Sequence, residues 1–480
     1  MNEAKLHQGE PMERTVKVLV INGSPKGEYS LTLQHSLYMV GQMSDVEWKV
    51  LSAGEALSPI QYDPVWLDSA IADISWCDAI VWTTPVYTML VPWQLIRLLR
   101  LIKDAGKNDI FRGKYATSMM TCFHYYDNLA EDWLRGMSED LGMYYLEGRT
   151  ADNMDMLKMK QRDSMRFFMQ EFIDTCRQHR VVERKYLPIS YNDSRPFRPG
   201  VLATPSDRPS PRTDAVPKTV LLTDETGKDG NLSRMIDVFV STYPYPVEIV
   251  DINDFPYEAG CHGCLKCELV GECDRKDGFQ AFYFNLVNSC DVLVFGMNLE
   301  DRYIRPVWKL FLDRSFSNGH RTSMMGKHTT YLVSGPLRSL PSVRLFLEAK
   351  DNVGRENAMG IISDEYDSSE ELQELIQETA KKLARAVDSK YQKSINFLGI
   401  GGIKIFRDLI YSMRGVVPDD HQFYRRNGLY DFPQKDVPKQ LFNLGMGIAF
   451  KAKPVRLQAW KRMPKLYIQL HKNIVDSGRR

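Results

Sequence analysis

An internal repeat is the feature that most limits how this chain can fold. The segments "WCDAIVWTTPVYTMLVPWQLIRLL" and "SCDVLVFGMNLEDRYIRPVWKLFL" each begin with a Cys-Asp pair before an apolar strand pattern, and each ends as a helix pattern after a polar loop and a Pro. Cys77 and Cys290 are 213 residues apart, and the Gly-Lys pairs of "FRGKYATSMMT" and "MMGKHTTYLVS" recur at the same offset, at Gly113 and Gly326. Each half also opens with a strand pattern, "VKVLVIN" and "KTVLLTD". Three shared segments in one order predict a duplicated domain.

Within each half, short apolar and β-branched runs alternate with longer helical patterns. The predicted strands of the first half are "KVLVIN", "AIVWTT", "YATSMMT" and "MYYLEG", and those of the second are "TVLLTD", "VEIVDI", "DVLVFGM", "TTYLVSG" and "AMGIIS". This alternation predicts an α/β fold with two doubly wound parallel sheets in tandem. Such sheets bind ligands at the carboxyl ends of their strands, so the loops after the strands are the candidate sites.

A proline-rich stretch separates the two halves. Seven of the 24 prolines fall between residues 188 and 217, with several Ser and Asp, and such a stretch continues neither a helix nor a sheet ladder. We therefore predict four regions: a first domain over 14–188, an extended linker over 189–216, a second domain over 217–392 and a C-terminal extension over 393–480.

The composition is that of a soluble globular protein. Apolar residues make up 43% of the chain and the net charge is +1, which gives no overall attraction to nucleic acid. No apolar run approaches the length of a membrane span, and the start "MNEAKLHQGEPMERT" lacks the apolar core of a signal peptide. These features predict a cytoplasmic protein without a transmembrane segment. In that reducing compartment, clustered cysteines more often bind metal or carry redox chemistry than form disulfides.

The C-terminal extension is basic. From Asn396 onward there are 16 Lys and Arg against 6 Asp and Glu, whereas the rest of the chain has 46 against 55. The glycines of "NFLGIGGIKIFRDLIYSMRG" follow no strand, so we interpret them as a hinge rather than a nucleotide loop. A lid over a bound cofactor, a docking arm and a membrane-surface helix are the alternatives for the rest. Because Pro454 and Pro464 interrupt the amphipathic pattern, packing on the acidic body is the interpretation that we favour.

The first loop of the first half has the pattern of an anion site. In "NGSPKGEYSLT" a strand leads through a Gly-Ser-Pro turn to a helix that begins near Ser30. Hydroxyls of Ser24, Ser30 and Thr32 and the N–H groups of the helix start form a cradle for a phosphate, to which Lys26 adds charge. The spacing matches neither a G-x-G-x-x-G nor a Walker loop, which argues against a dinucleotide or a triphosphate. A capped strand–helix turn without a ligand is the alternative.

Two further loops carry flat side chains. "TTPVYTMLVPWQL" offers Tyr87 and Trp93 on a path stiffened by prolines, and "TCFHYYDN" adds aromatic residues and His124. A planar ring lying on the second loop, with its phosphate on the first, fits this order of loops. Cys122 and His124 are two residues apart at a strand end, which is weak grounds for a nucleophile and its base.

Four cysteines lie together just past the middle of the chain. "CHGCLKCELVGEC" has the spacing C-x2-C-x2-C-x5-C, at Cys261, Cys264, Cys267 and Cys273. Three thiolates from one tight turn can reach one iron–sulfur cluster, as in bacterial ferredoxins, and the fourth can fold back to close the site. Zinc more often takes separated pairs of ligands. An iron–sulfur cluster is the leading interpretation, with idle thiols and zinc as the alternatives.

The first half resembles the flavodoxin-like NAD(P)H-dependent FMN reductase family, through "NGSPKGEYSLT", "TPVY" and the "GK" that precedes a strand, over residues 16 to about 187. The resemblance implies FMN as cofactor and NAD(P)H as co-substrate, with the phosphate on the first loop and the isoalloxazine ring along the second. Tyr29 stands where relatives often carry Asn. The cofactor-binding residues expected on this basis are Ser24, Lys26, Ser30, Leu31, Thr32, Pro85, Val86, Tyr87, Thr88, Cys122 and His124.

The second half, from about residue 218 to 390, resembles the iron–sulfur flavoproteins of the same superfamily. Its "AGCHGCLKCELVGECDRKDGF" matches their cysteine motif, which implies a [4Fe–4S] cluster on the four cysteines. Its flavin loops depart from the pattern: "TDETGKDGNLSRM" keeps only Asn231 and Ser233, and Glu300 and Asp301 stand where "TPVY" is expected. Two carboxylates beside an anionic cofactor would repel it, so we expect no FMN in this half.

The two halves are therefore complementary. Relatives work as oligomers, and we predict that this chain fuses two such subunits into a pseudo-dimer in which one FMN faces one cluster, with further homo-oligomerisation open. The predicted function is an oxidoreductase that takes hydride from NAD(P)H and passes electrons to a small-molecule or protein acceptor, with no nucleic-acid partner. An electron-transfer flavoprotein that takes no hydride, and a non-catalytic scaffold, are the alternatives.

Overall fold

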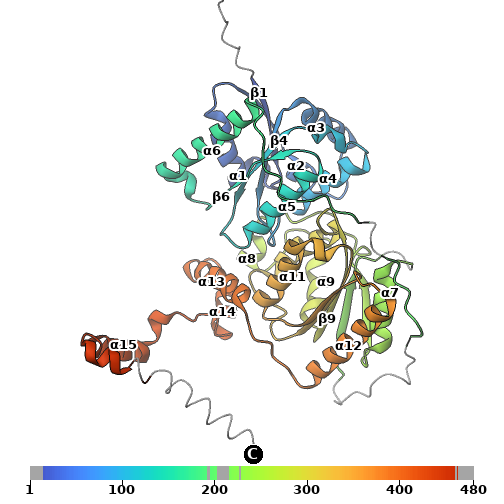
Figure 1. The fold of residues 1–480 in the computed structure, drawn as a ribbon, viewed down its shortest axis with the longest axis vertical. Helices are drawn as coiled ribbons and strands as arrows, with labels where there is room; N and C mark the ends of the chain where they lie inside the picture. Colours follow the sequence, from blue (N-terminus) through green and yellow to red (C-terminus); the bar gives the residue numbers. More distant parts are fainter. Residues whose placement is uncertain (1–14, 192–194, 203–215, 226–228, 460–461, 463–480) are drawn as a thin grey trace, which may run out of the picture. The chain divides into compact units, whose positions relative to one another are not determined.

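The computed structural model describes residues 15–191, 195–202, 216–225, 229–459 and 462 (Figure 1). Residues 1–423 belong to one compact unit, which contains both sheets, and residues 424–480 belong to a second. The centre of the predicted linker, 203–215, and Pro464 lie outside the described residues. The predicted limits of the four regions stay predictions.

The first domain is built on a parallel sheet in the order β2-β1-β3-β4-β5, and β6 also pairs with β4. Apolar and β-branched runs form its central strands, as predicted. The sequence analysis missed β2, whose "VEWKVL" is mostly exposed at the sheet edge. The strands are β1 (Val16–Asn22), β2 (Val46–Leu51), β3 (Ala79–Pro85), β4 (Tyr115–Thr121), β5 (Tyr144–Tyr145) and β6 (Arg149–Ala151).

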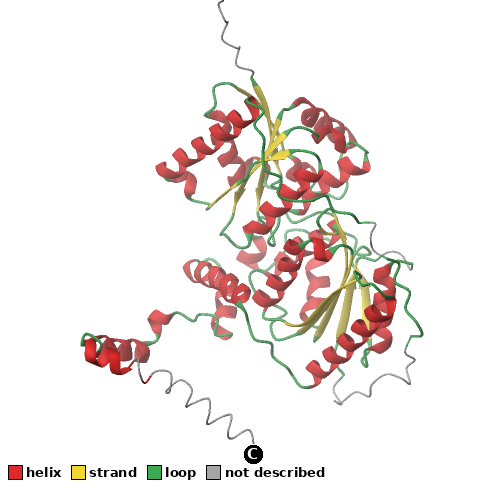
Figure 2. Ribbon diagram, in the orientation of Figure 1, coloured by secondary structure: helices red, strands yellow, loops and turns green. Residues whose placement is uncertain are grey.

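Helices cover both faces of this sheet (Figure 2). Val18 and Val20 of β1 point to a core with α1 and α6, whereas Leu19 and Ile21 point to a core with α3, α4 and α5, because side chains alternate along a strand. The helices are α1 (Leu31–Gly41), α2 (Ala53–Ala56), α3 (Pro64–Trp76), α4 (Trp93–Asp104), α5 (Asp127–Asp140) and α6 (Met159–Arg177).

The second domain repeats this architecture with the order β12-β11-β9-β7-β8, all parallel, and β10 joins β9 antiparallel. Its strands are β7 (Thr219–Thr223), β8 (Val247–Asp251), β9 (Val292–Glu300), β10 (Tyr303–Ile304), β11 (His328–Ser334) and β12 (Asn357–Ser363). Its helices are α7 (Asn231–Thr242), α8 (Lys266–Val270), α9 (Phe279–Tyr283), α10 (Pro306–Ser315), α11 (Pro341–Gly354) and α12 (Ser369–Asp388). The predicted fold of two doubly wound α/β domains is confirmed.

The repeated Cys-Asp pair performs the same structural task in both domains. Asp78 accepts a hydrogen bond from the backbone N–H of Lys17 at 3.0 Å, and Asp291 accepts the equivalent bond from Lys218 at 2.8 Å. Each carboxylate therefore ties the beginning of one central strand to the beginning of its neighbour. The repeat at this point marks the construction of the sheet, not a site.

The repeated Gly-Lys pair is equally structural. Gly113 and Gly326 adopt φ values of 76° and 78°, a conformation that glycine takes without strain. The ammonium groups of Lys114 and Lys327 then bond to backbone carbonyls at the end of the helix before the neighbouring strand. Both features appear at the offset of 213 residues that the sequence predicts.

The two domains share one continuous apolar core. Helices α4 and α5 of the first domain pack against α10 and α11 of the second, which are the equivalent helices of the other repeat. In a two-fold symmetric dimer the same surface of each subunit meets its copy. The fused chain has the contact pattern of such a dimer, as the duplication predicts.

The described residues 195–202 of the predicted linker form no helix or strand. Phe197 is buried between α7 and α12, and its N–H donates to Asn231 Oδ1 at 2.8 Å. Arg198 N donates to Ser369 Oγ at 2.9 Å. The linker is therefore anchored along the second domain.

The first part of the extension packs on the body within residues 1–423. The predicted glycine hinge is wrong, because Gly399 and Gly402 lie inside the helix α13 (Phe397–Ser412) beside α11 (Figure 1). A methyl group on Gly399 would lie 2.5 Å from the carbonyl oxygen of Asn352, and one on Gly402 would lie 2.5 Å from Val353 Cγ2. These glycines permit close packing of α13 on α11. The absence of a strand before them in the sequence argued only against a nucleotide loop and did not indicate this role.

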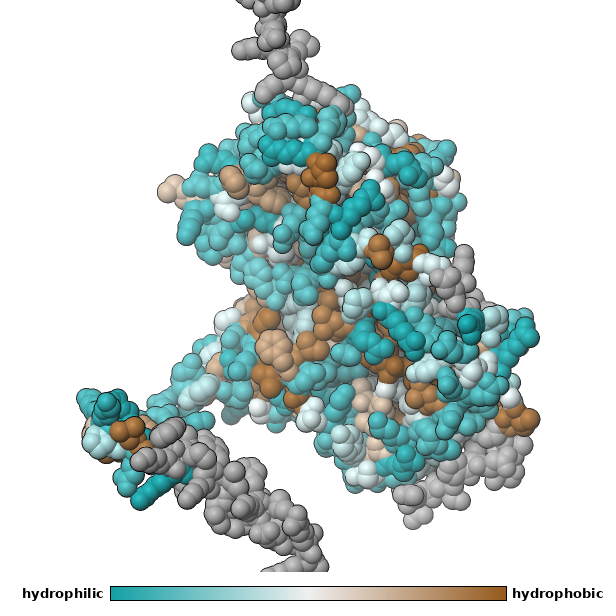
Figure 3. Space-filling view, in the orientation of Figure 1, coloured by the Kyte–Doolittle hydropathy of each residue, from teal (hydrophilic) through white to brown (hydrophobic). Residues whose placement is uncertain are grey.

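The remaining helices are α14 (Pro418–Arg426) and α15 (Val437–Ala449). The apolar side chains of α15 are exposed, and some are visible as brown surface in Figure 3; they are Val437, Leu441, Phe442, Leu444 and Ile448. Across the described residues, no helix combines the length and the apolar character needed to cross a membrane.

Candidate functional site

The first loop (22–32) is shaped by its own hydrogen bonds. Asn22 at the end of β1 accepts from Ser24 N and donates from Nδ2 to Gly27 O, both at 3.1 Å, and Ser24 Oγ accepts from Lys26 N at 3.3 Å. Gly27 has a φ of 55°. Asn22 was not among the predicted residues, although it precedes the Gly-Ser-Pro turn and fixes its conformation.

The loop leads into the N-terminus of α1. Ser30 is the N-cap, because its Oγ accepts from Leu33 N at 3.2 Å. The hydroxyls of Thr32 and Thr121 lie 2.5 Å apart, which ties the helix start to the end of β4. The first N–H groups of a helix have no intrahelical partner, so with the buried hydroxyls they are the candidate anion cradle that the sequence predicts. Leu31 is half exposed at the same turn, and Tyr29 points to solvent and does not fill the cradle.

The second loop (85–93) begins at the last residue of β3. Tyr87 and Leu90 exchange backbone hydrogen bonds of 2.7 and 3.0 Å, which closes a tight turn. Thr88 and Met89 at its tip have φ values of 47° and 64°, in the left-handed region. Such a conformation is costly for residues other than glycine and persists only where the surroundings enforce it.

The second domain holds this loop. On α10, Lys309 Nζ donates to Tyr87 O at 2.9 Å and Asp313 Oδ2 accepts from Trp93 N at 2.8 Å. Lys309 and Asp313 are also a buried ion pair, and the Thr88 hydroxyl bonds to the same carboxyl. Burial disfavours both charges, so it lowers the pKa of Lys309 and raises that of Asp313. The sequence analysis missed both residues.

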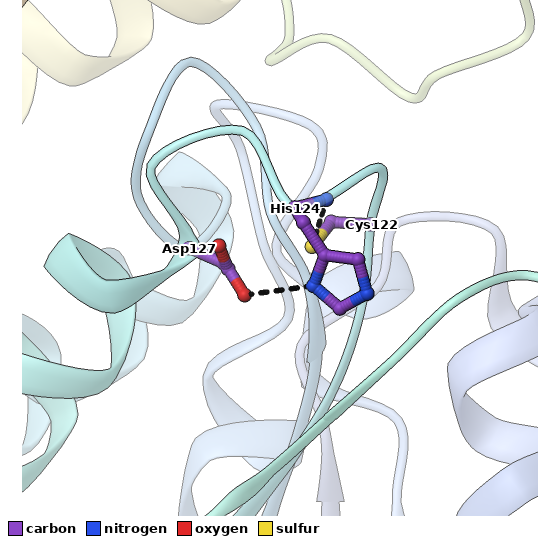
Figure 4. A group of neighbouring side chains, drawn as sticks. All are labelled: Cys122, His124 and Asp127. Carbon is purple, nitrogen blue, oxygen red and sulfur yellow. Dashed lines mark hydrogen bonds and ion pairs between the residues drawn. The ribbon is translucent and has the colours of Figure 1, made fainter. Parts of the chain in front are cut away.

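The third loop (122–127) brings Cys122, His124 and Asp127 together at the end of β4 (Figure 4). Cys122 Sγ accepts from His124 N at 3.2 Å, and His124 Nδ1 lies 3.3 Å from Asp127 Oδ2. Burial and the nearby Asp127 carboxylate raise the pKa of the Cys122 thiol to about 12. A raised pKa favours the protonated thiol near neutral pH and argues against a thiolate nucleophile.

Helix α13 covers the far side of the third loop. Tyr126 donates from its hydroxyl to Leu398 O at 2.5 Å, and the rings of Tyr125 and Phe406 lie 4.3 Å apart. The beginning of the extension therefore contacts the third loop.

The cysteine segment (259–277) of the second domain lies directly on the first domain. Gly260 N donates to Ser58 O at 2.8 Å, and Gln94 Nε2 donates to Cys261 O at 2.9 Å. Ser58 precedes α3 and Gln94 belongs to the first turn of α4. The sequence analysis did not identify Gln94, which links the two predicted cofactor sites.

The turn after Cys261 reaches both the first and the second loop. Gly263 has a φ of 64° and lies against the side chains of Tyr87 and Lys26. A methyl group on this glycine would overlap the Tyr87 hydroxyl and lie 3.2 Å from Lys26 Cε. Burial and the nearby Cys261, Asp313 and Cys264 raise the pKa of Tyr87. Tyr87, one of the residues predicted to lie along the flavin ring, is therefore in contact with the turn that follows Cys261.

All four predicted cysteines of the segment are free thiols, and they differ in exposure. Cys261 and Cys267 are partly buried, and burial raises the pKa of their thiols to about 12 and about 11. Cys264 is exposed and Cys273 is partly buried. Neighbouring thiols of the set contribute to the raised pKa values, which shows that they lie close enough to interact.

A buried arginine, Arg314, holds both ends of the cysteine segment. The Arg314 guanidinium bonds to the Asp277 carboxylate at 2.6 and 2.7 Å and to Ala259 O at 2.7 Å. Burial opposes ionisation of Asp277, but the hydrogen bonds from Arg314 outweigh it and lower the pKa of the carboxyl. Arg314 thereby places a fixed positive charge beside Cys261 and Cys273.

At the corresponding loops of the second domain, the described polar residues bond to one another and to the linker. Asn231 bonds to the linker and to Asp364, and Asp224 accepts from Asn298 N at 3.0 Å. The expectation that Glu300 and Asp301 keep FMN out of this half stays a prediction, but neither carboxylate is unpaired. They pair with cations on α4, as described below.

The chain is similar to known flavoproteins in sequence. Residues 16–151 match the family model of NADPH-dependent FMN reductases. An iron-sulfur flavoprotein of Archaeoglobus fulgidus is 25% identical over 221 residues, which cover 44% of this chain and 99% of the relative.

Two similar solved structures have lower identity. An NADH:FMN oxidoreductase is 16% identical, with a TM-score of 0.30, 35% of this chain and 92% of that chain covered. The flavoenzyme NAD(P)H:(acceptor) oxidoreductase FerB of Paracoccus denitrificans is 19% identical, with a TM-score of 0.29, 34% of this chain and 98% of that chain covered.

The family match falls on the domain that carries the anion cradle, and the flavodoxin-like sheet order appears twice. These findings support placing the chain in the flavodoxin-like superfamily that includes NAD(P)H-dependent FMN reductases and iron–sulfur flavoproteins, as a tandem of two domains of which the first matches the FMN reductase model over residues 16–151.

Proposed function

We propose that this chain is an NAD(P)H-dependent flavin oxidoreductase that holds FMN on its first domain and passes electrons to an acceptor through a [4Fe–4S] cluster on its second. The observation that carries the proposal is the contact of the cysteine segment with the first domain. Gly263 lies against Tyr87 and Lys26, and Gln94 holds Cys261. Electrons pass between centres that lie close together, and this contact joins the two predicted sites within one chain.

The residues of the first domain fit FMN. Ser24, Ser30 and Thr32 offer hydroxyls, the start of α1 offers N–H groups, and Lys26 offers a cation for a phosphate. Pro85 to Thr88 form a stiff edge for the ring, with Cys122 and His124 on the neighbouring loop. FMN supplies hydride acceptance and release of electrons one at a time, while the protein positions it and excludes water.

The four cysteines fit an iron–sulfur cluster better than zinc. Three of them come from one tight C-x2-C-x2-C turn, as in bacterial ferredoxins, whereas zinc more often takes separated pairs of ligands. Cys261, Cys264, Cys267 and Cys273 would therefore hold such a cluster, and the Arg314 cation would offset its negative charge.

We place the activity in the cytoplasm, since free thiols persist in a reducing compartment. The acceptor, a small molecule or a protein, and assembly into a homo-oligomer remain predictions. The hydrogen bonds of Asp224, Asn231 and Asp364 at the second domain's own loops support one FMN per chain.

The test is an absorption spectrum of the full chain purified without oxygen, with iron, sulfide and flavin assayed on the same sample. We expect two flavin bands with a broad shoulder near roughly 400 nm, about four irons and one FMN per chain. Anaerobic reduction by NADH or NADPH, with ferricyanide as acceptor, then measures turnover. Flavin without iron leaves a plain FMN reductase, and both centres without NAD(P)H oxidation leave an electron-transfer protein. A chain that binds neither FMN nor iron is a scaffold and overturns the proposal.

A further inference from the structure

The ion pair of Lys309 and Asp313 is the most deeply buried charge pair beside the candidate site. The two residues are one turn apart on α10, and their side chains are 0% and 1% exposed. A buried ion pair contributes little to stability, since desolvation offsets the attraction, and an apolar pair of similar size is often as stable. The position of these two charges therefore calls for another reason.

All the additional hydrogen bonds of the pair go to the second loop of the other domain. Lys309 donates to Tyr87 O, and Asp313 accepts from Trp93 N and from the Thr88 hydroxyl. These contacts hold the start of the turn at Tyr87, its tip at Thr88 and the end of the loop at Trp93. The left-handed Thr88 and Met89 lie between them, and such residues keep that conformation only under constraint.

The equivalent contact in the other direction is different in kind. On α4, Arg100 pairs with Glu300, and Lys103 pairs with Asp301 at 2.6 Å. Glu300 follows Tyr87 by 213 residues, and Asp313 follows Arg100 by the same number. These pairs lie at a partly exposed surface, where the cations are 35% and 43% exposed. The buried form occurs only on the side that faces the predicted FMN ring.

We infer that Lys309 and Asp313 are positioning residues that hold the second loop of the first domain in its flavin-binding conformation. The second domain therefore does more than carry the cysteines: it sets the shape of the edge on which the ring lies. The part of this inference that concerns FMN rests on the proposed function, whereas the part that concerns the loop does not.

The test compares full-length variants that remove both charges together. In Lys309→Met/Asp313→Leu no charge is left uncompensated, but Tyr87 O and Trp93 N lose their partners. Lys309→Met/Asp313→Asn is also neutral and keeps an acceptor for Trp93 N. Arg100→Met/Glu300→Gln removes the ion pair between α4 and the second loop of the second domain, at the equivalent side of the interface, and is the matched control.

The first measurement is amide hydrogen exchange of residues 85–92 in the FMN-free chain. We expect exchange at Tyr87 and Leu90 to be at least tenfold faster in Lys309→Met/Asp313→Leu, intermediate in the Asn variant and unchanged in the control. Thermal unfolding checks that each variant is folded. If the Leu variant is not folded, the exchange rates of the Asn variant decide the test. Unchanged exchange in a folded variant overturns the inference, whether or not the chain binds FMN.

The second measurement is the FMN dissociation constant, followed by quenching of flavin fluorescence, with the visible circular dichroism of the bound flavin. We expect weakening of about tenfold and an altered dichroism band in the Leu variant, partial recovery in the Asn variant, and no change in the control. Iron content stays at the wild-type value in all three. Faster exchange with unchanged affinity and dichroism would contradict the role in flavin positioning. Failure of the wild type to bind FMN would instead contradict the proposed function.

Discussion

Arg100 and Asp313 occupy equivalent positions in the two repeats, and each contacts the second loop of the opposite domain. Such reciprocity is the signature of a two-fold interface, in which residue i of one subunit meets residue j of the other and the reverse. In this chain the two contacts have diverged: one is an ion pair near the surface, and the other is a buried bond to backbone. The two equivalent helices therefore have different tasks: α4 stabilises the interface on one side, and α10 shapes a loop on the other.

Charge reversal at Arg100 should destabilise the interface only modestly. Because Arg100 and Glu300 are 35% and 25% exposed, we expect Arg100→Glu to cost about 1 kcal/mol. Differential scanning calorimetry should show a fall of about 1 °C in Tm, because the unit that unfolds is large. The double variant Arg100→Glu/Glu300→Lys should recover part of it, and the difference should shrink in 1 M salt. A loss that persists unchanged in high salt would show that packing, not charge, is responsible.

Removal of one cluster ligand should separate the two cofactors. We expect Cys264→Ala, at the exposed cysteine, to lose at least half of the iron while FMN content stays at the wild-type level. Reduction of the flavin by NAD(P)H should persist, because the FMN cradle lies on the other domain. The control is Cys290→Ala, since Cys290 is buried in the core beside Val287 O and lies in neither site. It should keep both cofactors and lose about 1 kcal/mol of stability. Loss of FMN in Cys264→Ala alone would contradict separate sites.

Alkylation should distinguish the thiols in chain freed of iron. Only the thiolate reacts, and a raised pKa leaves the thiol protonated. The reactivity of a thiol therefore falls about tenfold for each unit by which the pH lies below its pKa. With iodoacetamide at pH 8, mass spectrometry should find Cys264 modified first, because it is exposed. Cys122 and Cys261, whose pKa values are raised to about 12, should react at least tenfold more slowly. Rapid modification of Cys122 would show a thiolate at that position and reopen its pairing with His124.

The sequence could predict what is local or repeated. The sheets, the helix start at Ser30 and the repetition of the Cys-Asp pair follow from short patterns, whereas the roles of Asp78 and Asp291 came from the structure. The strand β2 was missed because its residues lie at an exposed edge, where apolar alternation is weak. The glycines of α13 were misinterpreted, because a neighbouring helix decides whether a glycine bends a chain or admits a close contact.

The assembly of the site could not be predicted, because it depends on residues far apart in the chain. Nothing near Glu300 indicates that Arg100, 200 residues away, neutralises it. Gln94 and Lys309 have ordinary helical surroundings in sequence, and only the fused interface gives them Cys261 and Tyr87 as partners. The sequence pattern of a loop can identify a candidate ligand. The partners of a buried polar side chain depend instead on which distant segments the topology brings together.

The phosphate cradle offers the sharpest test, because the chain contains its own control. Ser30 and Ser368 cap α1 and α12 in the same way, with Oγ accepting from Leu33 N at 3.2 Å and from Glu371 N at 3.1 Å. Loss of either cap should cost about 1 kcal/mol of the free energy of unfolding. Only Ser30 lies in the cradle, where a hydrogen bond to a charged phosphate is worth about 1.5–3 kcal/mol.

We therefore expect Ser30→Ala and Ser368→Ala to lower the stability to denaturant equally, while only Ser30→Ala raises the FMN dissociation constant, by about tenfold or more. Urea unfolding of the FMN-free chain measures the first quantity, and fluorescence titration with FMN measures the second. Equal FMN affinity in the two variants would show that the hydroxyl of Ser30 serves the helix alone, and the phosphate would then have to be sought elsewhere. An affinity loss confined to Ser30→Ala would place the phosphate at the start of α1, with the stability effect already accounted for by its counterpart.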